Sequence, residues 1–478
     1  MKSKRTVAAA AAALAICLCV PLGCSVRQPP PPPVNDLPAA YARTGGQSRA
    51  ASWWRAFDDA QLDALITEAL GASPDLAVWW DRLDQARALA RQAGAGQWPQ
   101  TDLRASATRS AHWPEAGSDV YGNEFGVGLY ASYEVDLWGR VRANRAAARH
   151  DVQASALNLR AAALSLSAQV ARVWYELAEA RAQIDLLDRQ LAANEQMLEL
   201  VTLRFQRGQV GASDVLQQEQ LVESIRGQRA LAAARRERLG QQLAVLLGRT
   251  PERAPAAEAA RLASPPPLPA TGVPADLLRQ RPDLEAAWAR VAAAHARLAS
   301  AIAERYPRLS LTASGQTGGV ETADLFSDWL GNLAANLLAP LLDGGSRAAE
   351  AARREAAARE ALHAYRATLL TALQEVEGAL ASDARHAEYV GHLRRQVELA
   401  TTVLARTEDD YRGGQADYLR VLQAQTSLQT LQRQLLTAQR EAIQYRIDLN
   451  RALGGDIQLQ RPGVADAGGH VGEEGSSR

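Results

Sequence analysis

The sequence predicts a mainly α-helical chain with four short β-strands, arranged as one structural unit used twice. Three observations predict it. Two runs of 68 residues are almost free of helix breakers, four short segments alternate apolar and polar residues, and a set of landmarks recurs about 207 positions later. Runs without helix breakers predict long helices, and alternating segments predict strands with one apolar face. Landmarks that recur at a constant offset indicate a tandem duplication.

Five landmarks define the duplication, since they keep their order and an offset of 206 to 208 residues. They pair as Pro74-Asp75-Leu76 with Pro282-Asp283-Leu284, Trp98-Pro99 with Tyr306-Pro307, Asp136 with Asp343, Phe205 to Gln209 with Tyr411 to Gln415, and Leu247-Gly248 with Leu453-Gly454. The predicted organisation is a signal peptide (1–23), a tether (24–50), a first repeat (51–250), a Pro-rich connector (251–273), a second repeat (274–455) and a flexible tail (456–478).

The N-terminus reads as an export signal. Lys2 and Lys4 precede an apolar run that is too short to span a bilayer, and Gly23 precedes Cys24. This arrangement resembles a bacterial lipobox, which implies a covalent lipid on Cys24; an ordinary signal peptide is the alternative. The proline run 29–33 predicts a stiff spacer between the lipid and the folded body.

Each repeat should contain one helix, two strands, a very long helix, a glycine-containing turn and a second long helix. The first helices are expected over Asp58–Ala93 and Pro274–Glu304, and the very long ones within Gly139–Gln206 and Gly345–Arg412. Each run would form roughly 100 Å of helix. Apolar residues spaced 3-4-3-4 from Ile184 onward predict knobs-into-holes packing. These helices alone would also suit a soluble coiled coil.

Four segments alternate apolar and polar residues with period 2. They are Thr101–Ser110, Phe125–Asp136, Arg308–Ser314 and Trp329–Leu337. The pattern is typical of transmembrane barrel strands, and equally of a small soluble sheet. Four strands cannot close a barrel, and an open sheet in a bilayer leaves backbone groups unpaired. If these are membrane strands, several chains must therefore share one barrel.

Four motifs carry a resemblance to a known family. They are Glu134 to Arg140 (EVDLWGR), Pro340 to Gly345 (PLLDGG), Arg281 to Leu284 followed by Tyr306-Pro307, and Tyr411 to Gln425 with its Arg412, Gly414 and Asp417-Tyr418-Leu419. Their order and spacing resemble the TolC-like outer-membrane factors of tripartite efflux pumps, in the lipoprotein branch, over nearly the whole mature chain.

The resemblance implies a homotrimer in the outer membrane. Four strands per chain would contribute to a 12-stranded β-barrel, continued by a long periplasmic α-helical barrel. It implies a passive duct that works with a periplasmic adaptor and an inner-membrane pump. The alternative is a periplasmic coiled-coil scaffold or adaptor lipoprotein without a pore.

Turn residues have a structural interpretation. Gly208, Gly413 and Gly414 permit the tight backbone that reverses a helical hairpin. The carboxylates of Asp136 and Asp343 should cap the helices that follow them. Their turns also contain Gly139, Gly344 and Gly345.

The resemblance implies that the periplasmic hairpin tip narrows the channel. Leu419 matches a constricting leucine, and Gln423 stands where the family usually has an acid. Asp417 and Arg420 are expected to hold the tip shut, and Asp214 and Gln217 take the equivalent positions in the first repeat. The alternative for each charge is a solvated helix surface.

Composition argues against other functions. Lys+Arg and Asp+Glu are both 53, so net charge does not favour a nucleic-acid partner. The seven histidines show no metalloprotease spacing, and neither a phosphate-binding GxxxxGK[ST] loop nor a GxSxG motif occurs. The sequence therefore predicts neither an enzyme nor a metal site or cofactor.

Overall fold

The computed structural model describes residues 37–43, 52–113, 120–254, 262, 264–455, 457, 459 and 461. The expected signal peptide, Cys24 and the proline run lie outside these residues, as do most of the C-terminal tail and part of the connector. The chain divides into two units. One comprises Asp84–Ala154 and Ala287–Tyr365, and the other comprises Pro33–Leu83, Ser155–Ala286 and Arg366–Arg478.

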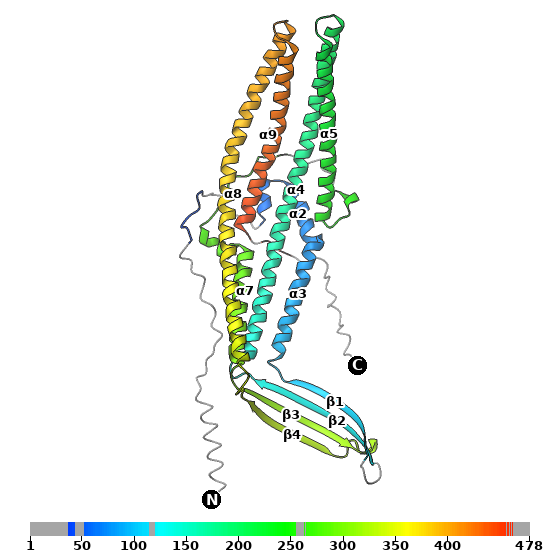
Figure 1. The fold of residues 1–478 in the computed structure, drawn as a ribbon, viewed down its shortest axis with the longest axis vertical. Helices are drawn as coiled ribbons and strands as arrows, with labels where there is room; N and C mark the ends of the chain where they lie inside the picture. The colour runs from blue at the N-terminus through cyan, green and yellow to red at the C-terminus, as the bar shows by residue number, and fades with distance from the viewer. Residues whose placement is uncertain are drawn as a thin grey trace, which may run out of the picture. The chain divides into compact units, whose positions relative to one another are not determined.

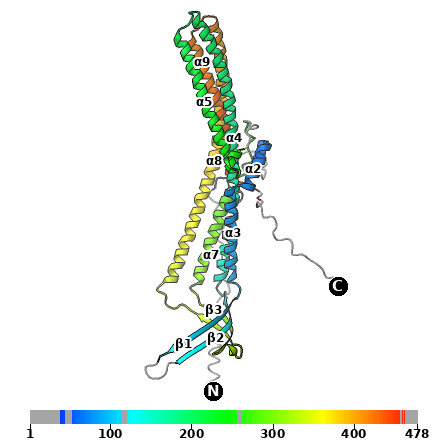
Figure 2. The same cartoon turned by 90° about the vertical axis from the view of Figure 1, so that its right-hand side faces the viewer.

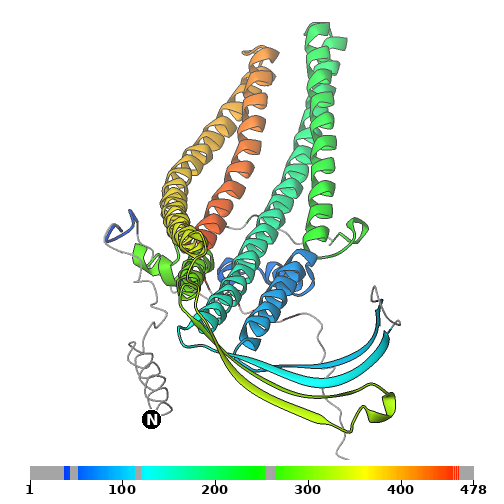
Figure 3. The ribbon, with the colours of Figure 1, turned by 60° about the horizontal axis from the view of Figure 1, so that its bottom comes forward.

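The first unit contains an antiparallel sheet whose strands lie in chain order, as Figures 1 and 3 show. The strands are β1 (Gln100–His112), β2 (Val120–Val135), β3 (Arg308–Gly319) and β4 (Trp329–Leu338), with a short helix η4 (Thr322–Asp324) between the last two. The alternating segments are therefore strands, as predicted, and β1 to β3 extend a few residues beyond the predicted bounds. The β2–β3 pairing joins the two repeats within one sheet.

Two helical hairpins occupy the second unit. One joins the end of α4 (Arg140–Gln206) to α5 (Ala212–Leu246), and the other joins the end of α8 (Ser346–Arg412) to α9 (Tyr418–Leu453) (Figures 1 and 2). Both α4 and α8 have 67 residues, as expected from runs without proline. The seam spacing holds in part: Leu187 and Val201 are buried, whereas Phe205 is 44% exposed.

The first helix of each repeat is not continuous, contrary to the prediction. In the first repeat η1 (Trp53–Phe57) and α2 (Ala60–Ala72) precede α3 (Pro74–Ala95). In the second, η3 (Pro274–Asp276) and α6 (Leu277–Gln280) precede α7 (Pro282–Ala303). The breaks fall at Ser73 and Arg281, both extended, because a following proline disfavours helical backbone. Proline then suits the first turn of the next helix.

In each repeat, the end of the last helix packs against this break. Gly248 and Gly454 follow α5 and α9 with φ of 73° and 75°. A Cβ on Gly248 would lie 2.4 Å from the carbonyl oxygen of Ala72, and one on Gly454 would lie 2.4 Å from that of Gln280. Only glycine therefore fits both the backbone conformation and the space. The short helix η2 (Pro251–Arg253) follows the first of these glycines.

Aromatic residues fix the N-terminal segment of the second unit on α4. Trp53, Trp54 and Phe57 of η1 are buried, and the Phe57 ring lies 5.6 Å from that of Tyr175. The Trp53 indole donates to the Ser167 hydroxyl at 3.1 Å, and the Trp174 indole donates to Asp59 at 2.8 Å. Burying these large rings with the two indole N–H groups paired stabilises the segment.

Arg281 connects three elements in the second unit. Its guanidinium donates to both oxygens of Asp283 (3.0 and 2.7 Å), to Glu375 of α8 (2.7 Å) and to the carbonyl of Ala452 in α9 (3.0 Å). The side chain is only 8% exposed. A buried charge requires such partners, so Arg281 also crosslinks the break between α6 and α7 to α8 and α9.

Candidate functional sites

One face of the sheet is apolar and exposed. The register pairs Leu103 with Leu129, Ala313 with Leu333, and Leu309 with Leu337. Because side chains alternate along a strand, these partners share one face. Leu103 is 74% exposed and Leu333 81% exposed. A contiguous apolar surface of this kind indicates that something other than water covers it.

The opposite face is polar. The Tyr130 hydroxyl and the Gln316 side-chain oxygen lie 2.6 Å apart, and the Arg104 guanidinium lies 4.7 Å from the centre of the Tyr130 ring. Serine, threonine and asparagine fill neighbouring positions, including Ser132 opposite Thr312 and Ser314 opposite Asn332. The sheet thus has one face suited to hydrocarbon and one suited to water.

Large aromatic residues lie at the ends of strands. Trp113 directly follows β1 and is 68% exposed, and Trp329 opens β4 at 66%. Phe326 precedes β4, with its ring 6.5 Å from that of Trp329. Aromatic rings at strand ends are typical of a membrane–water boundary.

Aspartates cap the long helices where the strands end. Asp136 accepts bonds from the backbone N–H groups of Val141 and Arg142, at 3.0 and 2.9 Å. Asp343 accepts from Arg347 and Gly345 in the same way, at 3.2 and 3.0 Å. These backbone bonds lower the pKa of Asp343. Positive φ values of 79°, 61° and 84° occur in these turns at Gly139, Gly344 and Gly345.

The two hairpin turns have matching backbone bonds. Gly208 donates to the Phe205 carbonyl at 2.8 Å, and Gly414 donates to that of Tyr411 at 3.1 Å. Both glycines have positive φ, 72° and 73°, which is the usual end of a helix before a reversal. Gly413 donates to the Asp409 carbonyl and has no positive φ.

The expected gate residues lie on the surface of the second turn. Leu419 is 50% exposed, and Arg420 and Gln423 are also exposed. Asp417 is the N-cap of α9 and accepts from the Arg420 backbone N–H at 3.1 Å. Within the described part of the chain, neither Asp417 nor Arg420 forms an ion pair. In the first hairpin Gln217 is exposed and Asp214 half-buried.

The contact that joins the two hairpin tips is one that the sequence did not indicate. Tyr418, 3% exposed, donates its hydroxyl to the buried side-chain oxygen of Gln218 in α5, at 2.5 Å. Burial raises the pKa of Tyr418, and the nearby Asp214 carboxylate raises it further, so the hydroxyl stays protonated as a donor. Around this bond lies an apolar cluster of Met197, Val201, Tyr411, Tyr418 and Val421.

Buried amides continue this contact along the hairpins. Gln218 donates to the Asn194 carbonyl at 2.8 Å, and Asn194 donates to the Gln190 carbonyl at 2.6 Å. Gln190 donates to the Gln432 side chain at 2.9 Å and accepts from Arg433 at 2.9 Å. We call Tyr418, Gln218, Asn194, Gln190, Gln432 and Arg433 the polar ladder. Because polar groups in a packed interior need partners, the ladder fixes how the two hairpins pair.

A further contact lies at the turn itself. The Arg204 guanidinium is 4.1 Å from the centre of the Tyr411 ring, and it donates to the carbonyls of Tyr411 and Arg412 at 3.2 and 3.3 Å. Arg204 therefore ties the end of α4 to the end of α8.

No set of three or more histidine, cysteine, aspartate or glutamate side chains among the described residues is placed to hold a metal ion. Among the helices that the structure describes, none has an apolar stretch of the length that a bilayer crossing requires.

Comparison with known proteins gives one consistent result. Residues 65–249 and 273–455 match the family described as "Outer membrane efflux protein". The pyoverdine export outer membrane protein OpmQ of Pseudomonas putida is 32% identical over 454 residues, which cover 92% of this chain and 96% of that protein. The toluene efflux pump outer membrane protein TtgF of Pseudomonas putida is 30% identical, covering 91% and 94%. The outer-membrane channel OprN has a TM-score of 0.81 at 26% identity, covering 90% of this chain and 99% of that one.

Proposed function

Since this chain belongs to the outer membrane efflux protein family, we propose that it is a passive duct through which an efflux system releases its cargo outside the cell. Membership establishes an outer-membrane component of efflux with a TolC-like fold. Beyond membership, several copies of the chain would together form a pore. A duct is favoured over an adaptor without a pore, because the named relatives are outer-membrane efflux and export proteins.

The observation that carries the proposal is the four-stranded sheet. It is amphipathic, and the outer edges of its strands β1 and β4 have no partner strand among the described residues. Unpaired edges in hydrocarbon cost several kcal/mol for each backbone group. Three chains side by side would satisfy both edges of every sheet and give twelve strands, with the polar faces lining an aqueous pore.

The partners follow from this arrangement. A homotrimer would continue the pore between the helices on the periplasmic side, where an adaptor and an inner-membrane pump would dock. A duct of this kind performs no chemistry on its cargo, and the pump would select what enters.

A lipid on Cys24 would add an anchor that the barrel does not need for insertion. Mass spectrometry of the mature N-terminus tests this, since any N-terminus other than a lipidated Cys24 contradicts it.

The hairpin tips supply the gate in this proposal. A permanently open pore would let solutes leak, so the tips must close the duct at rest and separate when a partner docks. Leu419 is our candidate for an apolar constriction. Five polar side chains from the same and neighbouring chains would surround Leu419. They are Asp417, Arg420, Asp214 and the neutral Gln423 and Gln217. Because Asp417 and Arg420 form no ion pair among the residues that the structure describes, they remain available for contacts between chains.

The experiment that tests the duct combines assembly and conduction. The purified protein should require detergent and have the mass of three chains by light scattering. After reconstitution in a planar bilayer, it should give discrete conductance steps. A monodisperse monomer in detergent-free buffer would contradict the membrane duct, and a trimer that never conducts would contradict the pore.

A further inference from the structure

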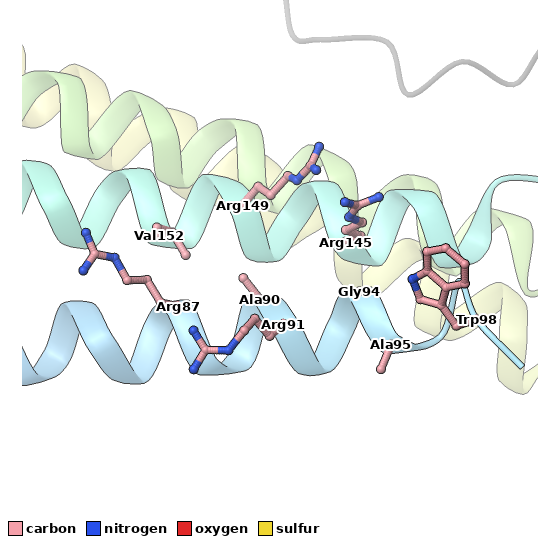
Figure 4. Close-up of a pocket in the computed structure, with 9 residues that line it drawn as sticks. All are labelled: Arg87, Ala90, Arg91, Gly94, Ala95, Trp98, Arg145, Arg149 and Val152. Atoms are coloured by element: carbon pink, nitrogen blue, oxygen red, sulfur yellow. The ribbon is translucent and has the colours of Figure 1, made fainter. Parts of the chain in front are cut away.

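An arginine-lined cavity lies in the first unit, separate from the hairpin tips. It has a volume of about 550 Å³ and lies between α3 and the start of α4. Figure 4 shows arginines from both helices along it, with Trp98 at the end where the chain leaves for β1. The lining residues are Arg87, Ala90, Arg91, Gly94, Ala95, Trp98, Arg145, Arg149 and Val152. We call this the arginine pocket.

Positive charge in the arginine pocket is only partly neutralised. Arg87 pairs with Asp84 at 3.2 Å, and Arg145 donates to the side-chain oxygen of Gln97, which carries no charge. Arg91 and Arg149 have neither an ion pair nor a hydrogen bond within the described residues. No acidic residue is among the residues that line the pocket. Four guanidinium groups beside a single carboxylate create a site for an anion.

The spacing of the arginines suits a phosphate group. Arg87 and Arg91 are one turn apart on α3, and Arg145 and Arg149 are one turn apart on α4. Guanidinium groups can each donate two parallel bonds to phosphate oxygens, which makes arginine a preferred phosphate ligand. Ala90, Ala95, Val152 and the Trp98 ring add an apolar wall, which inorganic phosphate would not need.

The position of the arginine pocket favours a lipid as the source of that phosphate. Trp98 is 74% exposed and precedes the first strand residue, Gln100, by two positions. The exposed apolar face of the sheet begins at Leu103, roughly 10 Å further at about 3.3 Å per strand residue. A tryptophan at this level is typical of the membrane interface, where phospholipid headgroups lie.

We propose that the arginine pocket binds the phosphodiester headgroup of an anionic glycerophospholipid from the periplasm-facing leaflet. Arg91 and Arg149 supply the free charge, Arg145 and Arg87 complete the cradle, and Trp98 packs against the glycerol and the upper acyl chain. Such a site would set the depth of the sheet in the bilayer through a specific contact, in addition to the hydrophobic band. It depends on the outer-membrane location and is independent of the gate and of the trimer.

The test measures lipid retention by the full-length protein. Protein in a mild detergent is incubated with phosphatidylglycerol or phosphatidylcholine, and bound lipid is counted by native mass spectrometry. A parallel arm adds inorganic phosphate alone. The variant is Arg91→Gln with Arg149→Gln. The control is Arg353→Gln with Arg359→Gln, which removes two charges from exposed side chains on α8 in the same unit, 61% and 62% exposed.

Wild type and control should retain phosphatidylglycerol in preference to phosphatidylcholine. The pocket variant should bind it about 25-fold more weakly, since each basic side chain near an anionic headgroup contributes roughly a factor of five. Equal retention by the variant would overturn the proposal. Displacement of the lipid by millimolar inorganic phosphate would assign the pocket to free anions. If the variant loses its oligomeric state while lipid binding is unchanged, the pocket is an interface between copies of the chain. Displacement by phosphate and loss of the oligomer would each overturn the lipid assignment.

Discussion

At the scale of single residues, the hairpin tips separate two kinds of side chain. Leu419 is half exposed in one chain, so other chains or cargo can contact it, whereas Tyr418 beside it is buried against Gln218. The first is available for closing a duct, and the second maintains the shape of the protomer. Substitutions at adjacent positions should therefore have different effects.

Replacing Leu419 with alanine should raise single-channel conductance and admit large antibiotics such as vancomycin, because it removes apolar volume from the proposed constriction. A double change of Asp417 and Arg420 to alanine should act in the same direction by removing polar contacts, each worth about 0.5–1.5 kcal/mol. Planar-bilayer recordings and antibiotic sensitivity measure this. Leu231→Ala, at a 74% exposed leucine in the middle of α5, is the control. Unchanged conductance in both tip variants would place the constriction elsewhere.

Tyr418→Phe should lower stability without removing any apolar surface. It leaves the side-chain oxygen of Gln218 buried without its donor, which costs about 1–3 kcal/mol. The matched control is Tyr411→Phe, since the Tyr411 hydroxyl is buried with no hydrogen-bond partner among the described residues. Thermal unfolding in detergent measures both. If the two variants melt together, the bond at 2.5 Å contributes nothing to the pairing of the hairpins.

At the scale of elements, both repeats use the same joint, in which a helix end meets a break before proline. Gly248 lies against Ala72, and Gly454 lies against Gln280. Gly455 adds a backbone bond to the Gln280 carbonyl at 3.1 Å. The joint keeps the last helix of each repeat beside its first helices.

Gly454→Ala should destabilise the protein by at least about 2 kcal/mol. The cost combines a left-handed backbone for alanine with a Cβ placed 2.4 Å from the Gln280 carbonyl oxygen. Gly391→Ala is the control: this helical glycine has nothing within 4 Å, so alanine should be neutral or stabilise α8 by about 0.5–1 kcal/mol. Melting temperatures that fall equally would show that the space around Gly454 is not limiting.

Asp283 gives an acid-dependent contribution at the second joint. Burial acts to raise the pKa of Asp283, but the Arg281 guanidinium outweighs it and the pKa lies below its usual value. A lowered pKa means that the stabilisation is present above about pH 4 and is lost as pH falls through the folded-state value. Asp283→Asn should therefore lower the melting temperature at pH 7, with the difference narrowing below pH 4. Asp75→Asn, at the same position of the first repeat, is the control, because Asp75 forms no ion pair among the described residues, and it should leave the melting temperature at pH 7 nearly unchanged.

How far the sequence predicts this structure depends on the kind of signal. Period-2 alternation and long runs without proline predicted the strands, α4 and α8, because local geometry dictates those patterns. The breaks before Pro74 and Pro282 were missed. Proline is favoured in the first turn of a helix, so each proline marks the start of a new helix, whereas the prediction placed it within one continuous helix. The polar ladder was missed because glutamine on a long helix usually lies on the surface. Asn194 in the middle of an apolar seam was its only sequence signal.

At the scale of the whole molecule, the sheet has two unpaired edges, and we expect strands of neighbouring chains to pair with them. Each chain offers β1 and β4 as edges, and exposed edges pair with any available strand. The proposal therefore requires β1 of one chain to lie beside β4 of the next.

Cysteine crosslinking can detect that neighbour. With Cys17, Cys19 and Cys24 replaced by serine, Ser106→Cys in β1 should form a disulfide between chains with a cysteine at one of positions 332, 334 or 336 in β4. A non-reducing gel of membranes should then show a ladder that ends at three chains. A cysteine pair with both residues in β1, Ser106 and Arg104, is the control and should not form the ladder. Crosslinks that continue beyond three chains would contradict the closed trimer.

The central pairing of the sheet also dictates an order of events during biogenesis. The β2–β3 contact between Tyr130 and Gln316 spans 186 residues, including the whole first hairpin and the connector. A chain that emerges from its N-terminus has only the β1–β2 ribbon until the second repeat arrives, and an isolated two-stranded ribbon is marginal in water. Closing so long a loop is slow. The exported chain must therefore cross the periplasm with unpaired strand edges and exposed apolar side chains. A chaperone that binds these strands at that stage would determine how much of the chain reaches the membrane.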